Sequence, residues 1–181
     1  MSQVDNSSSR ISLLSGIMQD IDLGPTTGVQ MMFAKLQLAQ SQLCKNQAES
    51  YMKQIEDIQA EQKKCADMIA KARELQNAAK NGTGDCSWDK NASMMPQEMA
   101  DYFNKHGLSY DKKGNDLANN KDEWDYNLKS LTNYQEQIGT SVQTKMVYLQ
   151  DFIGQYNSYL QGANTQIANA NQVLNNLARG Q

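Results

Sequence analysis

Apolar residues recur at alternating steps of four and three positions through the last third of the chain. The repeat contains Leu117, Trp124, Leu128, Leu131, Ile138, Val142, Leu149, Phe152, Tyr156, Tyr159, Ala163, Ala170, Val173 and Leu177. A heptad pattern held over this many turns is typical of one coiled-coil helix, which we predict over residues 117–178. Such a helix would be about 90 Å long. Another long helix, from this chain or from a neighbour, must therefore cover its apolar seam.

A second coiled-coil segment is predicted over residues 25–80. Gly24, Pro25 and Gly28 form a break at its beginning, and the long helix follows this break. Asn81 and Gly82 are suited to end this helix. We expect an all-α fold: a long antiparallel coiled-coil hairpin with a small insert between the two long helices. The predicted seam consists of Leu36, Leu43, Ile55, Ile58 and Ile69 on the first helix and Leu128, Leu131, Ile138, Val142, Leu149 and Phe152 on the second.

The insert is predicted over residues 81–116, with a short helix over 96–105. Pro96 suits a first helical turn, Ser93 is a candidate cap, and His106 with Gly107 ends the helix. The insert is rich in large side chains: Trp88, Met94, Met95, Met99, Tyr102, Phe103 and Tyr110, with Trp124 just beyond it. These residues indicate either a small core that holds the insert to the hairpin or an exposed recognition surface.

Residues 1–24 form a polar leader with a short apolar patch between Ile11 and Ile21. The leader has neither the apolar run nor the cleavage site of a Sec signal, and no stretch of the chain is apolar enough for a membrane span. We expect a leader that is flexible on its own and that orders on a partner.

A second apolar stripe adjoins the seam of the C-terminal helix. Its members are Met146, Ile153, Leu160, Ile167 and Leu174, and Leu177 completes the face at its end. A two-helix hairpin covers only a narrow seam, so a wider face needs a third element. We interpret these six residues as a self-assembly interface. The alternative is a wider core in which residues 11–40 of the same chain cover the stripe.

Composition argues against several functional classes. The chain is 39% hydrophobic and carries a net charge of -3, so it has no basic surface for nucleic acid or anionic lipid. His106 is the single histidine and is expected at the surface, and no catalytic, cofactor-binding or metal-ligating set is recognisable. Of the three cysteines, Cys44 and Cys65 suit buried helical positions, while a Cys65–Cys86 disulfide is the alternative.

The order of these segments resembles that of the type III secretion needle-tip and tip-filament proteins, and within them the EspA/SseB-type filament subunits. Residues 29–61 are similar in texture to the first coiled-coil helix of that family. Residues 95–108, MPQEMADYFNKHGL, resemble its insert helix, and residues 141–177 resemble the C-terminal helix with which the family polymerises.

The resemblance implies a non-enzymatic structural subunit that is exported through the secretion needle and self-assembles at its tip into an extracellular filament or cap. The implied partners are further copies of the chain, the needle subunit, a cytosolic chaperone before export, and the pore-forming translocators at the host membrane. The alternative is an intracellular coiled-coil adaptor or chaperone in which the same face closes a small oligomer.

Overall fold

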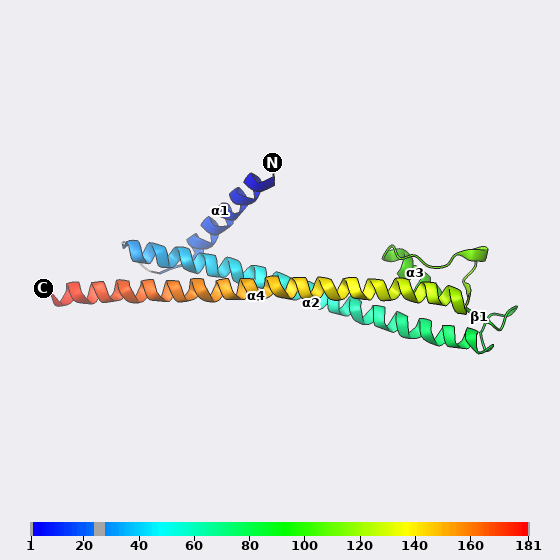
Figure 1. Ribbon diagram of the computed structural model, residues 1–181. Helices are drawn as coiled ribbons and strands as arrows, with labels where there is room; N and C mark the ends of the chain where they lie inside the picture. The colour runs from blue at the N-terminus through cyan, green and yellow to red at the C-terminus, as the bar shows by residue number, and fades with distance from the viewer. Residues whose placement is uncertain (1, 24–27, 181) are drawn as a thin grey trace. The chain divides into compact units, whose positions relative to one another are not determined.

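The computed structural model describes residues 2–23 and 28–180, with side chains from residue 11 onward except that of residue 115. The expected break at residues 24–28 falls largely outside the described residues. Figure 1 shows the elements, which are α1 (Ser2–Asp20), α2 (Val29–Lys80), β1 (Ala92–Met94), α3 (Gln97–Lys105), a 3-10 turn (Lys113–Asn115), β2 (Ala118–Asn120) and α4 (Lys121–Arg179).

The predicted helical hairpin is confirmed, because α2 and α4 pack against each other in antiparallel directions. Near the hairpin connection, Cys65 of α2 donates from Sγ to the carbonyl of Leu131 at 3.5 Å. Toward the other end, Lys145 of α4 donates from Nζ to Oε1 of Gln54 at 2.6 Å. The chain divides into two compact parts, which we call the leader unit (residues 1–54 and 145–181) and the insert unit (residues 55–144).

The insert unit holds the large buried side chains. Trp124, Phe103 and Leu131 are fully buried, together with Met99 of α3. The Trp124 indole donates to Oγ of Ser93 at 2.8 Å, and that hydroxyl donates to the carbonyl of Leu75 at 2.8 Å. These bonds join α4, β1 and α2, so the aromatic residues form a core that holds the insert to the hairpin.

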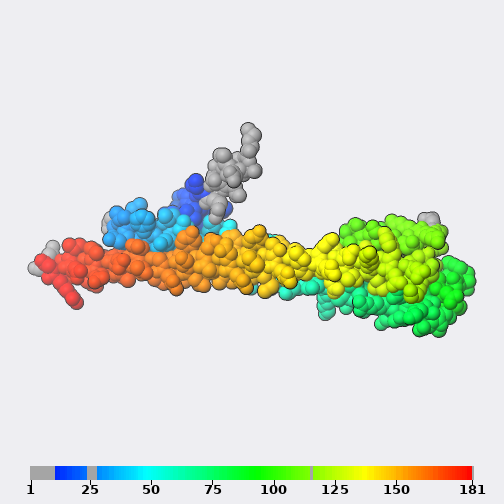
Figure 2. Space-filling view, viewed as in Figure 1, coloured from blue at the N-terminus to red at the C-terminus, as the bar shows by residue number. Residues whose placement is uncertain are grey.

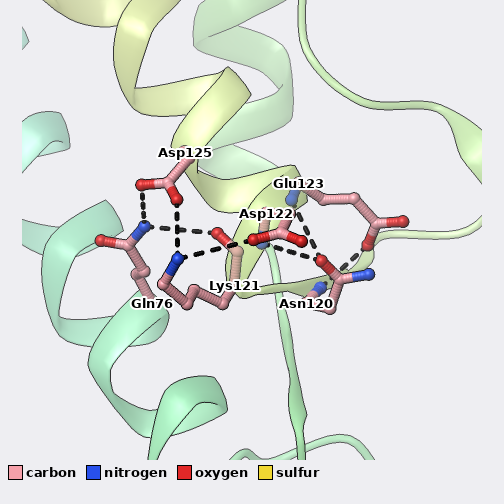
Figure 3. A network of polar contacts seen from close by, with 6 residues as sticks. All are labelled: Gln76, Asn120, Lys121, Asp122, Glu123 and Asp125. Carbon is pink, nitrogen blue, oxygen red and sulfur yellow. Dashed lines mark hydrogen bonds and ion pairs between the residues drawn. The ribbon is translucent and has the colours of Figure 1, made fainter.

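The start of α4 is fixed by polar contacts (Figure 3). Asn120 accepts from the backbone N–H of Glu123 at 3.1 Å, and Oε2 of Glu123 accepts from the backbone N–H of Asn120 at 2.8 Å. This reciprocal pair is a capping box. Gln76 of α2 donates to Oδ1 of Asp125 at 2.5 Å, which ties the cap region to α2. Gln76, followed by Lys121, holds the pKa of the exposed Asp125 carboxyl below its ordinary value.

Three details differ from the sequence-based expectations. Residues 2–20 of the leader, expected to be flexible, form α1, because Leu14, Ile17 and Met18 give it a half-buried stripe. The C-terminal helix begins at Lys121 rather than at residue 117, because residues 118–120 pair with β1 as an antiparallel strand. Ser93 therefore lies in β1 and does not cap α3, whose first helical residue is Gln97. Cys44 and Cys65 are buried, as expected, and the alternative Cys65–Cys86 disulfide is not formed.

The expectation that His106 lies at the surface is also wrong, because its side chain is mostly buried. Its Nδ1 shares a hydrogen bond of 2.7 Å with Tyr134, and its Nε2 lies 3.2 Å from Oε1 of Glu61 without hydrogen-bond geometry. Tyr102 donates to the same Glu61 oxygen at 2.5 Å. Burial, and then that hydrogen bond, raises the pKa of Tyr102 above its ordinary value. The cluster attaches the end of α3 to both long helices.

Candidate assembly surface

In the leader unit, α2 and α4 meet through small side chains. The buried residues on this seam are Ala34, Ser41, Cys44, Ala48, Ala163 and Ala170, while the buried Ala39 lies about 160° around α2 from Gln37, on another side of the helix. Gly162 leaves room for the amide of Gln37, because a Cβ at Gly162 would lie 2.6 Å from the Gln37 nitrogen. The helices approach closely, but this seam buries little apolar area compared with a seam of leucines.

The predicted seam residues divide between the two units. In the insert unit, Ile55, Ile69, Leu131 and Ile138 are buried, and Ile58, Leu128 and Val142 are half-buried. In the leader unit, Leu149 and Phe152 are half-buried, and Phe152 stacks on Tyr51 with 5.6 Å between ring centroids. The pattern therefore marks the buried side of α4 through both units.

Leu36 and Leu43 both border α1, a neighbour that the seam prediction did not include. Leu36 lies about 100° around α2 from Gln37, which faces α4, and it lines a groove with Met18 of α1. Leu43 lines a pocket with Leu14 of α1 as well as with Tyr159 of α4. Val29, Met32 and Leu36 of α2 thus border α1, while Ala34, Ser41, Cys44 and Ala48 lie on the side of α2 that faces α4.

The six residues of the predicted assembly interface all lie in the leader unit, and none is fully buried. Met146 is 45% exposed and Ile153 is 44% exposed, while Leu160 and Ile167 are half-buried. Leu174 and Leu177 are the most open, at 62% and 66%. Val147, Tyr148 and Val173 of α4 are exposed as well. Sequence reasoning did not assign Val147 and Tyr148 to any surface, and it placed Val173 in the heptad seam, although the structure leaves Val173 46% exposed.

The alternative cover for this stripe is residues 11–40. Leu14 of α1 lines a pocket with Gln155 and Tyr159 of α4. Gln155 lies about 160° around α4 from Ile153, so α1 borders the flank away from the predicted interface. The third element of the leader unit therefore covers one flank of the hairpin, and Met146 and Ile153 on the other flank remain exposed.

The pairing of the two helices leaves the end of α4 without a partner helix. Gln54 meets Lys145, Cys44 meets Gln155, and Gln37 lies against Gly162. The same register places Ala170, which is buried, opposite the first residue of α2. Residues 171–180 are exposed at every position among the described residues, and the red end of α4 extends past the start of α2 in Figures 1 and 2.

Electrostatics favour contact along this part of α4. Between Asp151 and Arg179 the sequence contains no Asp, Glu, Lys, Arg or His. Two copies of this segment can therefore approach without repulsion between like charges, and burial there desolvates no ionised side chain. The polar positions are mostly Asn and Gln, whose amides both donate and accept hydrogen bonds across an interface.

Within the described part of the chain, no three His, Cys, Asp or Glu side chains gather as metal ligands would. None of the described helices combines the length and the apolar character that crossing a bilayer requires. No protein-family model matches the chain, and neither the curated proteins nor the solved structures yield a match. The resemblance to the tip-filament proteins therefore enters the account as a proposal.

Proposed function

We propose that this chain is a non-enzymatic structural subunit of a type III secretion apparatus, which self-assembles at the needle tip into an extracellular filament or cap. The observation that carries the proposal is the exposed apolar face on α4 of the leader unit, from Met146 to Leu177. Exposed apolar patches of this kind mark interaction sites on proteins. Met146, Ile153, Leu160, Ile167 and Leu174 recur every seven residues along α4, which suits contacts with several copies in succession.

The rest of the proposal follows from the resemblance in residues 29–61, 95–108 and 141–177. The assembled subunit links the needle to the pore-forming translocators at the host membrane. Before export, a cytosolic chaperone covers the apolar face, since an uncovered face of this kind would associate prematurely. The leader carries the export signal. The partners are proteins, with no role for nucleic acid and no direct membrane span.

Two double variants test the self-assembly. Leu160→Asp with Ile167→Asp removes the middle of the face, and Met146→Asp with Ile153→Asp removes its more exposed start. Each should convert concentrated protein from polymer to monomer in sedimentation velocity, because the charges must be desolvated in the interface. The second pair keeps the test valid if the half-buried Leu160 and Ile167 prove necessary for folding, and circular dichroism reports the helix content of both.

A matched control lies in the insert unit. Tyr126 is 52% exposed on the same helix, so Tyr126→Asp adds one charge at similar exposure outside the proposed face. This variant should polymerise like the unchanged protein. Polymer formation by both double variants would contradict the proposal. A closed dimer of the unchanged protein would favour the intracellular adaptor instead, whereas a ring of copies is one form of the proposed cap.

A further inference from the structure

Resting on the self-assembly proposed above, we propose that Met146 is an oxidation site through which a peroxide controls that assembly. The apolar stripe of α4 consists of Met146, Ile153, Leu160, Ile167 and Leu174, and its one sulfur-containing member is Met146. Oxidation converts the apolar thioether of a methionine into a polar sulfoxide. The oxidised monomer assembles poorly, and reduction of the sulfoxide restores assembly.

The sulfur of Met146 is open to solvent in the monomer. Among the methionines whose side chains the structure describes, three are exposed: Met32 at 60%, Met52 at 49% and Met146 at 45%. Met95 and Met99 of the insert unit are almost completely buried. A peroxide must reach the sulfur, so it reacts with the exposed methionines before the buried ones. Met146 lies on α4, whereas the other two exposed methionines lie on α2.

The cysteine thiols compete poorly for the same oxidant. Cys44, Cys65 and Cys86 are all buried. Burial also raises the pKa of the Cys65 thiol, which disfavours the reactive thiolate. A mild dose of peroxide therefore modifies the exposed methionines and leaves the thiols largely unchanged.

The oxidation balances with hydrogen peroxide as the oxidant. The sulfur lone pair of Met146 attacks one peroxide oxygen, and the S–O bond forms as the O–O bond breaks. The other oxygen takes up the remaining proton and leaves as water, so the thioether is oxidised and the peroxide is reduced. Methionine sulfoxide reductases reverse the change. A dithiol supplies the electrons for this reduction and becomes a disulfide, and the sulfoxide oxygen leaves as water.

The sulfoxide affects the assembly more than the fold. In the monomer the new oxygen points into water and stays hydrated. In the proposed interface the same oxygen is buried against another copy, and Ile153, the next member of the stripe, offers no hydrogen-bond donor. Burying a polar group without a partner is unfavourable. The oxidised chain should therefore need an about tenfold higher concentration before it polymerises.

Peroxide treatment followed by sedimentation velocity tests the site. The unchanged chain is oxidised with hydrogen peroxide while monomeric, its sulfoxides are located by peptide mass spectrometry, and the protein is then concentrated. Polymer should form only at an about tenfold higher concentration, and the sulfoxide reductases should cancel this shift. Met146→Leu should resist the oxidant, because leucine keeps the apolar character without the sulfur. Met32→Leu and Met52→Leu are matched controls at exposed positions and should stay as sensitive as the unchanged chain.

A polar substitution tests the same position without any oxidant. Met146→Gln introduces an uncharged polar side chain of similar length. The untreated variant should show the same increase in the concentration needed for polymer. Circular dichroism should show unchanged helix content, since Met146 is exposed in the monomer. A Met146→Gln protein that polymerises like the unchanged chain would contradict the inference.

The outcomes separate this inference from the proposed function. If the untreated chain polymerises but oxidised Met146→Leu loses its polymer as readily as the oxidised unchanged chain, the site is wrong while self-assembly stands. Resistance conferred by Met32→Leu or Met52→Leu would overturn the assignment in the same way. An untreated chain that stays monomeric at every concentration would overturn both.

Discussion

The leader unit and the insert unit share the same two long helices but bury very different residues. In the insert unit the side chains that face inward are large, with Trp124, Phe103 and Leu131 fully buried. In the leader unit the buried residues are alanines, a serine and a cysteine. Apart from Trp88 and Tyr126, the large apolar side chains exposed among the described residues all lie in the leader unit.

The difference follows from what covers the hairpin in each unit. In the insert unit, α3 and the β1–β2 ladder add a third set of side chains, and the core cluster contains residues of α2, α3 and α4 together. In the leader unit, Ile11 and Leu14 of α1 line a pocket with Gln155 and Tyr159 of α4, and Met146 and Ile153 of α4 stay exposed. One unit is thus complete within the chain, and the other presents apolar surface that a second chain can cover.

The largest expected effect is on the free energy of unfolding, when a buried leucine and an exposed leucine are each replaced by alanine. Leu131→Ala should lower the free energy of unfolding by about 2–5 kcal/mol, because Leu131 is fully buried and its loss leaves a cavity. Leu174→Ala should change the stability of the monomer by less than about 0.5 kcal/mol. Urea unfolding at low protein concentration measures both values. Equal losses in the two variants would show that the two units do not differ as described.

Replacing one glycine in each unit by alanine should change the stability by an intermediate amount, with opposite signs in the two units. A Cβ at Gly84 of the insert unit would lie 1.9 Å from the carbonyl oxygen of Ala92, whereas one at Gly154 of the leader unit would meet nothing within 4 Å. Gly84→Ala should therefore destabilise the protein by about 1–3 kcal/mol. Gly154→Ala should stabilise α4 by about 1 kcal/mol. Thermal unfolding of both variants measures these shifts, and a Gly84→Ala protein of unchanged stability would contradict the close packing at the insert.

The smallest effect is a pH dependence in the insert unit. Burial raises the pKa of Tyr102, so the unfolded chain loses this proton near pH 10 while the folded chain keeps it. The resulting stability is complete below about pH 10 and decreases above it, by at most about 1.4 kcal/mol per pH unit for one group. Tyr102→Phe removes this dependence. The unfolding free energy of the unchanged protein, minus that of Tyr102→Phe, should therefore fall between pH 9 and 11, and a constant difference would contradict the buried hydroxyl.

The hairpin could be predicted from the sequence because long periodic patterns outweigh local detail. The repeat from Trp124 to Ala170 marks the buried side of α4, and Pro96 locates the start of α3 to within one residue. The β1–β2 ladder was missed because strands of three residues have no periodicity to detect. The burial of His106 depends on Glu61 and Tyr134, which are distant in sequence.

The assembly surface could be predicted only in part. The apolar character of Met146, Ile153 and Leu174 was visible, but exposure depends on which flank of the hairpin α1 borders. The contact of Leu36 and Leu43 with α1 was not predicted, because an apolar stripe does not say which of two neighbouring helices it faces. The unpaired end of α4 follows from the register of α2 against α4, in which Gln54 meets Lys145 and Gln37 lies against Gly162, and the heptads alone do not specify that register.

Negative-stain electron microscopy of the purified chain, concentrated at neutral pH without a chaperone, tests the central claim most directly. That claim is that the leader unit completes its apolar packing only with further copies. The account predicts long filaments of uniform width, which the Met146→Asp, Ile153→Asp double variant should abolish while Tyr126→Asp should not. Single particles of monomer size at every concentration would contradict it.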